Sequence, residues 1–144
     1  MLFDQVTNNE SKDPSALPLA PAVTIPSDAV DMELLNAFAE LQTDDEPDLI
    51  VELIDLYLED APQRITAIRK ASVATEWVLL KRAAHNLKGS SGNLGVRHVA
   101  EVCAELETVC PDSPERVPAL VQLLEYRFAK ARQTLATERR RRLQ

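Results

Sequence analysis

Glycine and aromatic residues are scarce in this 144-residue chain, with three glycines in all and aromatics at 4%. Sheet proteins need more of both, for tight turns and packed strand faces, so the composition favours helices. No apolar run approaches the roughly 20 residues that span a bilayer. The first residues also lack the basic and then apolar order of a secretory signal. Since 45% of the residues are hydrophobic, we expect one folded, cytoplasmic domain.

An excess of positive charge is also missing, because the formal net charge is −7 at pH 7. Nucleic-acid-binding surfaces are basic, so we expect no nucleic-acid partner. The exception is the run of arginines from Arg139 to Arg142. Cations complement the dipole at the C-terminus of a helix. We therefore interpret the run as a solvated helix end, with a functional basic tag as the alternative.

Cysteine is limited to Cys103 and Cys110. On one helix, seven residues separate two Cα atoms by roughly 10 Å, whereas a disulfide needs about 7 Å or less. We expect no disulfide and two small, buried side chains. The two histidines, His85 and His98, have no carboxylate cluster beside them, so no metal is expected. His98 is expected to be structural or on the surface.

Apolar residues recur at spacings of three and four in five segments, which predicts five helices. The first is short, begins near Ser27 or Asp28, which are good N-caps, and runs through Leu41. The second begins around 46–47 and contains Pro62, where a kink or a break is expected. The other three are expected over about Thr75–Ser91, Val96–Cys110 and Glu115–Arg140.

Short loops between the long helices imply antiparallel neighbours. We therefore predict an all-α fold, an antiparallel up-down-up-down four-helix bundle with an additional short N-terminal helix. Residues 1–27 contain four prolines and no periodic apolar pattern, which indicates a flexible leader. The bundle domain is then expected over 28–144. Met1 and the short leader favour a free-standing protein.

The residues with the clearest chemical potential surround His85, on the third predicted helix. Lys88 follows three residues later and Gly89 four residues later, so both lie beside His85 on a helix. At about 100° per residue, His85 falls roughly 110° from the centre of the apolar stripe, at the edge of the buried face. This arrangement suits a histidine that another protein must reach and that must carry a negatively charged group.

The run Ala84–Gly95, AHNLKGSSGNLG, and the later segment Glu101–Glu107 together resemble the signature of histidine-containing phosphotransfer (HPt) domains. These domains are the intermediate carriers of multistep two-component phosphorelays. The resemblance covers roughly residues 28–140 and is most specific over 83–107. It implies that His85 accepts a phosphoryl group from the phospho-aspartate of one receiver domain and passes it, reversibly, to another.

The resemblance also implies roles for the neighbours of His85. Lys88 is expected to neutralise phosphoryl oxygens, and Lys81, one turn before His85, to add to the positive field. Gly89 is expected to leave a gap through which a partner approaches. Asn86 and Ser90 are expected to line the approach surface.

Glu107 departs from the family pattern, which often has Gln or another polar residue at this position, on the neighbouring helix and facing the histidine. A carboxylate near His85 could hydrogen-bond a ring N–H and fix the tautomer. It could equally repel the phosphoryl group. The sequence leaves both roles open.

No Gly-rich ATP lid, P-loop or kinase motif is present in the sequence, so we expect a phosphocarrier without kinase activity. The implied partners are response-regulator receiver domains and a hybrid sensor histidine kinase, bound by a monomer. No cofactor of its own is expected, and Mg²⁺ is expected on the partner receiver domain. Two alternatives remain, namely an adaptor that binds receivers without carrying phosphate and a metal-binding or redox bundle that uses His85, His98 and the cysteines.

Overall fold

A computed structural model describes residues 29–41 and 48–144, and these residues form helices and connecting turns with no strand among them. A 3₁₀ turn, Pro114–Arg116, precedes the last helix. The five α-helices are α1 (Met32–Ala39), α2 (Leu49–Ala74), α3 (Trp77–Asn93), α4 (Arg97–Val109) and α5 (Val117–Arg142).

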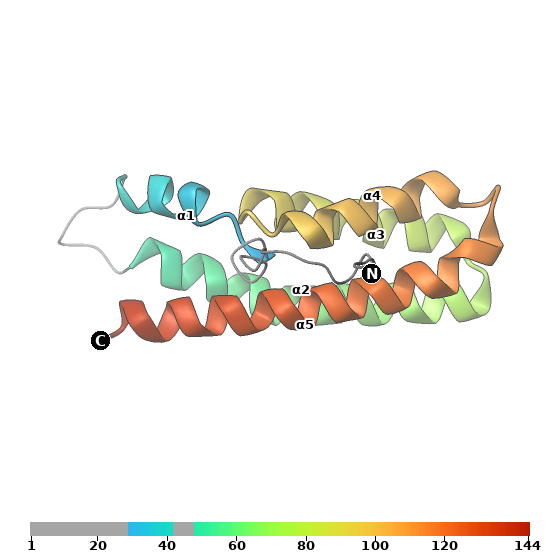
Figure 1. The fold of residues 1–144 in the computed structure, drawn as a ribbon. Helices are drawn as coiled ribbons and strands as arrows, with labels where there is room; N and C mark the ends of the chain where they lie inside the picture. The colour runs from blue at the N-terminus through green and yellow to red at the C-terminus, as the bar shows by residue number, and fades with distance from the viewer. Residues whose placement is uncertain (1–28, 42–47) are drawn as a thin grey trace, which may run out of the picture.

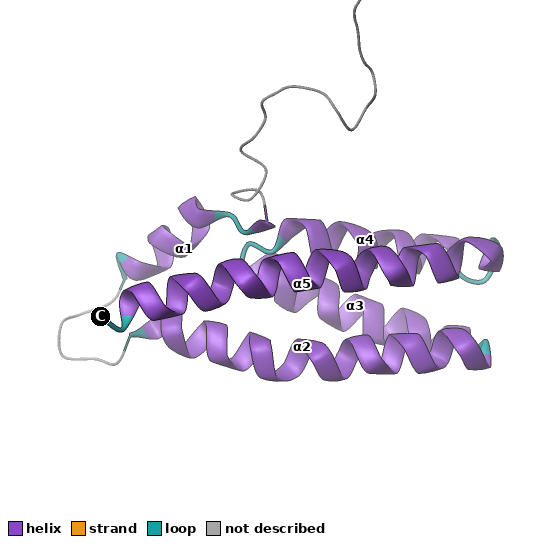
Figure 2. Ribbon diagram, turned by 60° about the horizontal axis from the view of Figure 1, so that its bottom comes forward, coloured by secondary structure: helices purple, strands orange, loops and turns teal. Residues whose placement is uncertain are grey.

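Helices α2 to α5 form a four-helix bundle in which each helix runs opposite to the one before it (Figure 1). α3 packs between α2 and α4, and α5 closes the ring by packing against α4 and α2. α2 and α5 have 26 residues each and extend beyond α3 and α4 at one end. α1 covers this end and packs on α2 (Figure 2). The predicted all-α bundle with a short N-terminal helix is confirmed.

Aspartate caps set where the first two helices begin. Asp31 accepts hydrogen bonds from backbone N–H groups of the first turn of α1, and Asp48 does the same for α2. Such caps satisfy backbone donors that have no partner inside the helix. The predicted first positions of both helices, 27–28 and 46–47, lie outside the described residues. Leu41 was predicted inside the first helix, but it lies beyond the C-cap of α1 and is 75% exposed.

Pro62 does not break α2, which continues from Leu49 to Ala74. Of the kink or break predicted at this position, the break is therefore wrong. A proline removes one backbone donor, but Ile54 before it and Ile65 after it are both buried on the same face. Packing of this continuous apolar face outweighs the single lost hydrogen bond.

The connection between α2 and α3 and the end of α3 also differ from the prediction. Thr75, in the left-handed conformation with φ 53°, ends α2, and α3 begins only at Trp77. α3 continues past Ser91 to Asn93, so Gly92 is helical rather than part of the turn. The turn is made by Gly95, with φ 82°, a conformation that glycine adopts without a steric penalty.

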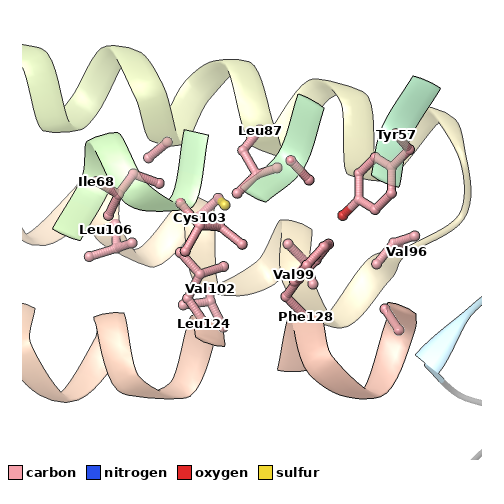
Figure 3. Packing of buried hydrophobic residues seen from close by; sticks show 14 of the residues in the cluster. Tyr57, Ile68, Leu87, Val96, Val99, Val102, Cys103, Leu106, Leu124 and Phe128 are labelled. Atoms are coloured by element: carbon pink, nitrogen blue, oxygen red, sulfur yellow. The ribbon is translucent and has the colours of Figure 1, made fainter. Parts of the chain in front are cut away.

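The limits of α4 and α5 lie within two residues of the prediction, apart from the 3₁₀ turn that contains Glu115. Side chains from four helices meet in the core, where Tyr57 donates to or accepts from Ser91 Oγ at 2.8 Å (Figure 3). Both cysteines are buried and free, as predicted. Leu80 on α3, Val102 on α4 and Leu124 on α5 are fully buried, whereas Trp77 at the start of α3 is partly buried.

The arginine run does end α5, as predicted, but it is not simply solvated. Arg139 Nε lies 2.6 Å from Asp55 Oδ1 on α2. Arg142, only 13% exposed, lies 2.7 Å from Glu138 and also donates to Asn36 on α1. These contacts join three helices at the end of the bundle that α1 covers.

Gly95 and Gly92 give a matched test of the turn. A Cβ on Gly95 would lie 3.0 Å from Asp31 Cβ and 3.1 Å from its carbonyl oxygen, at a positive φ. Gly95→Ala should lower the free energy of unfolding by more than about 1 kcal/mol. Gly92 is helical with nothing within 4 Å of an added Cβ, so Gly92→Ala should raise it by up to about 1 kcal/mol. Urea unfolding measures both, and equal effects would contradict the placement of the turn.

Candidate functional site

His85 lies near the middle of α3 and points away from the core. Its side chain is 66% exposed, while Ala84 and Leu87 on either side of it are fully buried. The imidazole is thus held by a helix whose opposite face is packed, and it remains open to an approaching molecule. This exposure places His85 outside the buried stripe of α3.

Glu107, from the adjacent helix α4, holds one nitrogen of the His85 ring. Its Oε2 lies 3.0 Å from His85 Nδ1. An ionised carboxylate only accepts hydrogen bonds, so in the neutral ring Nδ1 carries the proton and donates it. The lone pair then resides on Nε2, at the far side of the ring. Of the two roles left open for Glu107, this geometry is that of the tautomer-fixing partner.

The same carboxylate also binds Lys88. Glu107 Oε1 is buried, and Lys88 Nζ lies 2.7 Å from it, as a close ion pair rather than an aligned hydrogen bond. Lys88 comes from the turn of α3 that follows His85. Glu107 therefore bridges the histidine and the lysine, with one oxygen on each.

The charge state of the bridge follows from these contacts. Burial acts to raise the pKa of Glu107, but the close contacts with Lys88 and then with His85, together with the charges of these groups, outweigh it and leave that pKa below its usual value. Glu107 is thus ionised at neutral pH. Beneath it, burial and the nearby Glu107 carboxylate raise the pKa of Cys103 to about 12, against the opposing charge of Lys88. Cys103 is an uncharged thiol at neutral pH and is a poor nucleophile or metal ligand.

Gly89 leaves open space beside the histidine, since a Cβ built on it meets nothing within 4 Å. Lys81 is exposed, and its charge acts on Cys110, where burial raises the thiol pKa and Lys81 offsets only part of that rise. Asn86 is exposed next to His85. Ser90 donates to the Leu87 carbonyl of its own helix. The structure thus joins His85, Lys88 and Glu107 and leaves Lys81 and Ser90 outside that cluster.

Sequence reasoning missed an apolar groove next to α3. The groove has a volume of about 750 Å³ and is formed by the end of α1, the first half of α2 and the end of α3. Leu41 and Leu56 are exposed along it, at 75% and 63%, while Ser90 lies on its α3 side. Leu56 is an exposed leucine on the otherwise polar face of α2. This leucine is the sequence signal that points to the groove.

The described part of the chain contains neither a cluster of potential metal ligands nor a helix that could span a membrane. Within 29–41 and 48–144, no three His, Cys, Asp or Glu side chains are grouped to hold a metal ion. His98 is half-buried at the start of α4, where its carbonyl accepts from Arg127. No described helix combines the length and apolarity that crossing a bilayer requires.

The described residues thus form a four-helix bundle that carries an exposed histidine linked through an acidic side chain to a basic one. The chain matches the family model of the Hpt domain over residues 52–139. It therefore belongs to the Hpt domain family.

Two solved structures share this fold. The chain is similar to histidine-containing phosphotransfer protein B from Pseudomonas aeruginosa, with 30% identity and a TM-score of 0.69, over 78% of this chain and 96% of that one. It also resembles in fold the histidine-containing phosphotransfer protein MtHPt2 from Medicago truncatula, with a TM-score of 0.71 at 20% identity, over 85% and 86% of the two chains.

Two curated relatives from Arabidopsis thaliana are also similar. Histidine-containing phosphotransfer protein 2 is 31% identical over 74 residues, 49% of this chain and 47% of the relative. Histidine-containing phosphotransfer protein 5 is 31% identical over 81 residues, 52% of each chain. The chain thus aligns with about half the length of the curated relatives it matches.

The bridge predicts a specific acid titration. Lys88→Met should raise the pKa of Glu107 toward its ordinary value, because the strongest of the contacts that lower it is lost. A lowered pKa in the folded state contributes stability above the ordinary carboxyl pKa, and this stability is lost as pH falls through the lowered one. The variant should therefore lose up to about 1 kcal/mol of stability at neutral pH and little in acid.

An NMR titration of the Glu107 side-chain carboxyl carbon measures the pKa directly, and denaturant unfolding at each pH measures the stability. Lys81→Met is the matched control, since Lys81 is exposed on the same helix and is not among the causes of the lowered pKa. A Glu107 titration that Lys88→Met leaves unchanged would contradict the bridge.

Proposed function

We propose that this chain is a phosphorelay intermediate that accepts a phosphoryl group on His85 from the phospho-aspartate of one receiver domain and donates it to another. The observation that carries the proposal is the exposed His85 ring with its Nδ1 held by Glu107. Membership of the Hpt domain family supports it independently.

The reaction uses the ring nitrogen that Glu107 leaves available. The lone pair of His85 Nε2 attacks phosphorus, the new N–P bond forms, and the P–O bond to the donor aspartate breaks, so that its electron pair returns to the carboxylate. The ring then carries a positive charge, with Nδ1 protonated against the Glu107 carboxylate. The N–P bond remains reactive, so the reverse sequence delivers the group to a second carboxylate. Positioning and charge neutralisation suffice for such a transfer.

Lys88 and Gly89 support this step in different ways. The ammonium of Lys88 has three donors, so it can contact a phosphoryl oxygen while Glu107 still holds it. Gly89 leaves the space that a receiver needs to bring its aspartate into line with Nε2. Asn86 and the apolar groove beside α3 offer the surrounding docking surface.

The partners follow from this chemistry. We propose response-regulator receiver domains and a hybrid sensor histidine kinase as partners, a monomeric carrier in the cytoplasm, and no kinase activity or cofactor in this chain. Mg²⁺ would be supplied by the receiver domain. A leader over 1–27 stays a prediction, because those residues lie outside the described part of the structure.

The function is tested by phosphoryl uptake from a phosphorylated receiver domain. The chain should acquire an acid-labile, base-stable phosphoryl group, and His85→Gln should abolish its uptake. His98→Gln is the matched control, because His98 is the other histidine in the sequence and should leave uptake unchanged. If the chain binds receivers but takes up no phosphoryl group from any of them, the adaptor interpretation replaces the proposal.

Partner access is tested at Gly89. Gly89→Leu should fill the open space beside His85 and slow transfer at least about tenfold, which corresponds to about 1.4 kcal/mol in the barrier. The fold should persist, because a Cβ built at this exposed position meets nothing within 4 Å. Ala129→Leu on α5, an exposed position on the helix diagonally opposite α3, is the control. Circular dichroism confirms folding, and a normal transfer rate in Gly89→Leu would contradict the access role.

A further inference from the structure

The contact between Glu107 and His85 has consequences for the phosphorylated ring as well as for the free one. Glu107 Oε2 lies 3.0 Å from Nδ1, and Oε1 is held 2.7 Å from Lys88 Nζ. Both oxygens are thus anchored, and the carboxylate, 22% exposed, is fixed from the side of α4. An amide in this place would be able to donate to Nδ1 as well as accept from it, whereas an ionised carboxylate only accepts.

The cations on α3 oppose a positive charge on the ring. Lys81, Arg82 and Lys88 all lie within one helical turn of His85. Like charges disfavour the charged form of a neighbouring group. On their own, these three side chains would make a phosphorylated His85 lose its Nδ1 proton more readily.

α4, the helix packed against this side of α3, supplies the opposing charge. Cys103 on α4 is an uncharged thiol at neutral pH. Glu107 is ionised, so among the described residues it is the anion in contact with the ring. A proton that left Nδ1 would leave a nitrogen lone pair facing a carboxylate oxygen at hydrogen-bonding distance, which is repulsive.

We propose that Glu107 keeps the proton on Nδ1 after His85 is phosphorylated, and that this retained proton allows the phosphoryl group to leave again. This inference rests on the proposed function. In the onward step the Nε2–P bond breaks and its electron pair returns to Nε2, while an oxygen of the acceptor carboxylate forms the new O–P bond. With Nδ1 protonated, the ring departs as a neutral imidazole. Without that proton, it would have to depart as an anion, which is a far poorer leaving group.

If Glu107 keeps the proton on Nδ1, phosphoryl transfer from His85 should persist at alkaline pH. Above the midpoint of its titration, the protonated fraction of an imidazole ring falls about tenfold per pH unit. An opposite charge in contact moves such a midpoint up by about one to three pH units. Wild-type transfer should therefore remain constant over at least one pH unit in which transfer from a Glu107→Gln chain already declines.

The test loads each purified chain with phosphoramidate, a small chemical phosphoryl donor, and follows the ¹⁵N resonances of phosphorylated His85 from acid to alkaline pH. The same samples give the rate at which the phosphoryl group is lost to water and to a receiver domain. Glu107→Gln should lose the Nδ1 proton at a pH at least one unit lower, and its rate relative to wild type should fall about tenfold on the alkaline side.

Two further variants separate this role from a structural one. Glu105→Gln removes an exposed carboxylate two residues away on α4, where it pairs with Arg116, and should behave as wild type. Glu107→Asp restores a carboxylate on a shorter side chain and should recover part of the alkaline rate. A merely structural effect of Glu107→Gln would lower the rate equally at every pH.

The outcomes distinguish this inference from the function beneath it. If all chains are loaded on His85 but wild type and Glu107→Gln titrate together with a constant rate ratio, the inference is wrong and the carrier function stands. If His85 takes up no phosphoryl group from phosphoramidate or from a phosphorylated receiver, the proposed function fails and the inference fails with it.

Discussion

The packing of α3 against α4 is the constraint on which the site depends. His85 and Glu107 are 22 positions apart in the sequence, yet their side chains meet at 3.0 Å because these two helices pack along their lengths. Leu87 on α3 and Leu106 on α4 are both fully buried and fix the two helices on the core side (Figure 3). The charged cluster on the outside is therefore positioned by hydrophobic packing on the inside.

This arrangement suits a carrier, which must bind its cargo and release it with similar ease. The protonated Nδ1 is tied to a fixed carboxylate, and the exposed part of the ring is left for the partner. Lys88 balances the charge of Glu107 and, under the proposed function, would have donors left for a phosphoryl group. Under the proposed function, one surface histidine and two charged neighbours suffice, because the receiver domain would bring the other catalytic groups.

Much of the fold could be predicted because apolar residues repeat at helical spacing throughout the bundle. The helix ends were predicted less well. Asp31 and Asp48 cap helices at residues that a periodic pattern does not single out, and α3 continues past its predicted end at Ser91 to a turn made by Gly95. The helix-breaking effect of Pro62 was overestimated. Burial of the surrounding apolar face of α2, which is a tertiary effect, decides whether the helix continues.

The candidate site, like the fold, could be predicted only in part from the sequence. His85, Lys88 and Gly89 are local in sequence, so a helical spacing rule and a family resemblance located them. The two roles considered for Glu107 could not be separated, because the choice depends on where α4 lies against α3. The groove beside α3 and the contacts of Arg142 with α1 were missed for the same reason, since each combines segments far apart in the chain.

The central claim is that Glu107 holds the proton of the resting His85 ring on Nδ1. Nitrogen-15 NMR of the unphosphorylated protein, at a pH where the ring is neutral, measures the tautomer directly. The account predicts a protonated Nδ1 and an unprotonated Nε2, with this preference weakened in Glu107→Ala. A resting ring that carries its proton on Nε2 would contradict it.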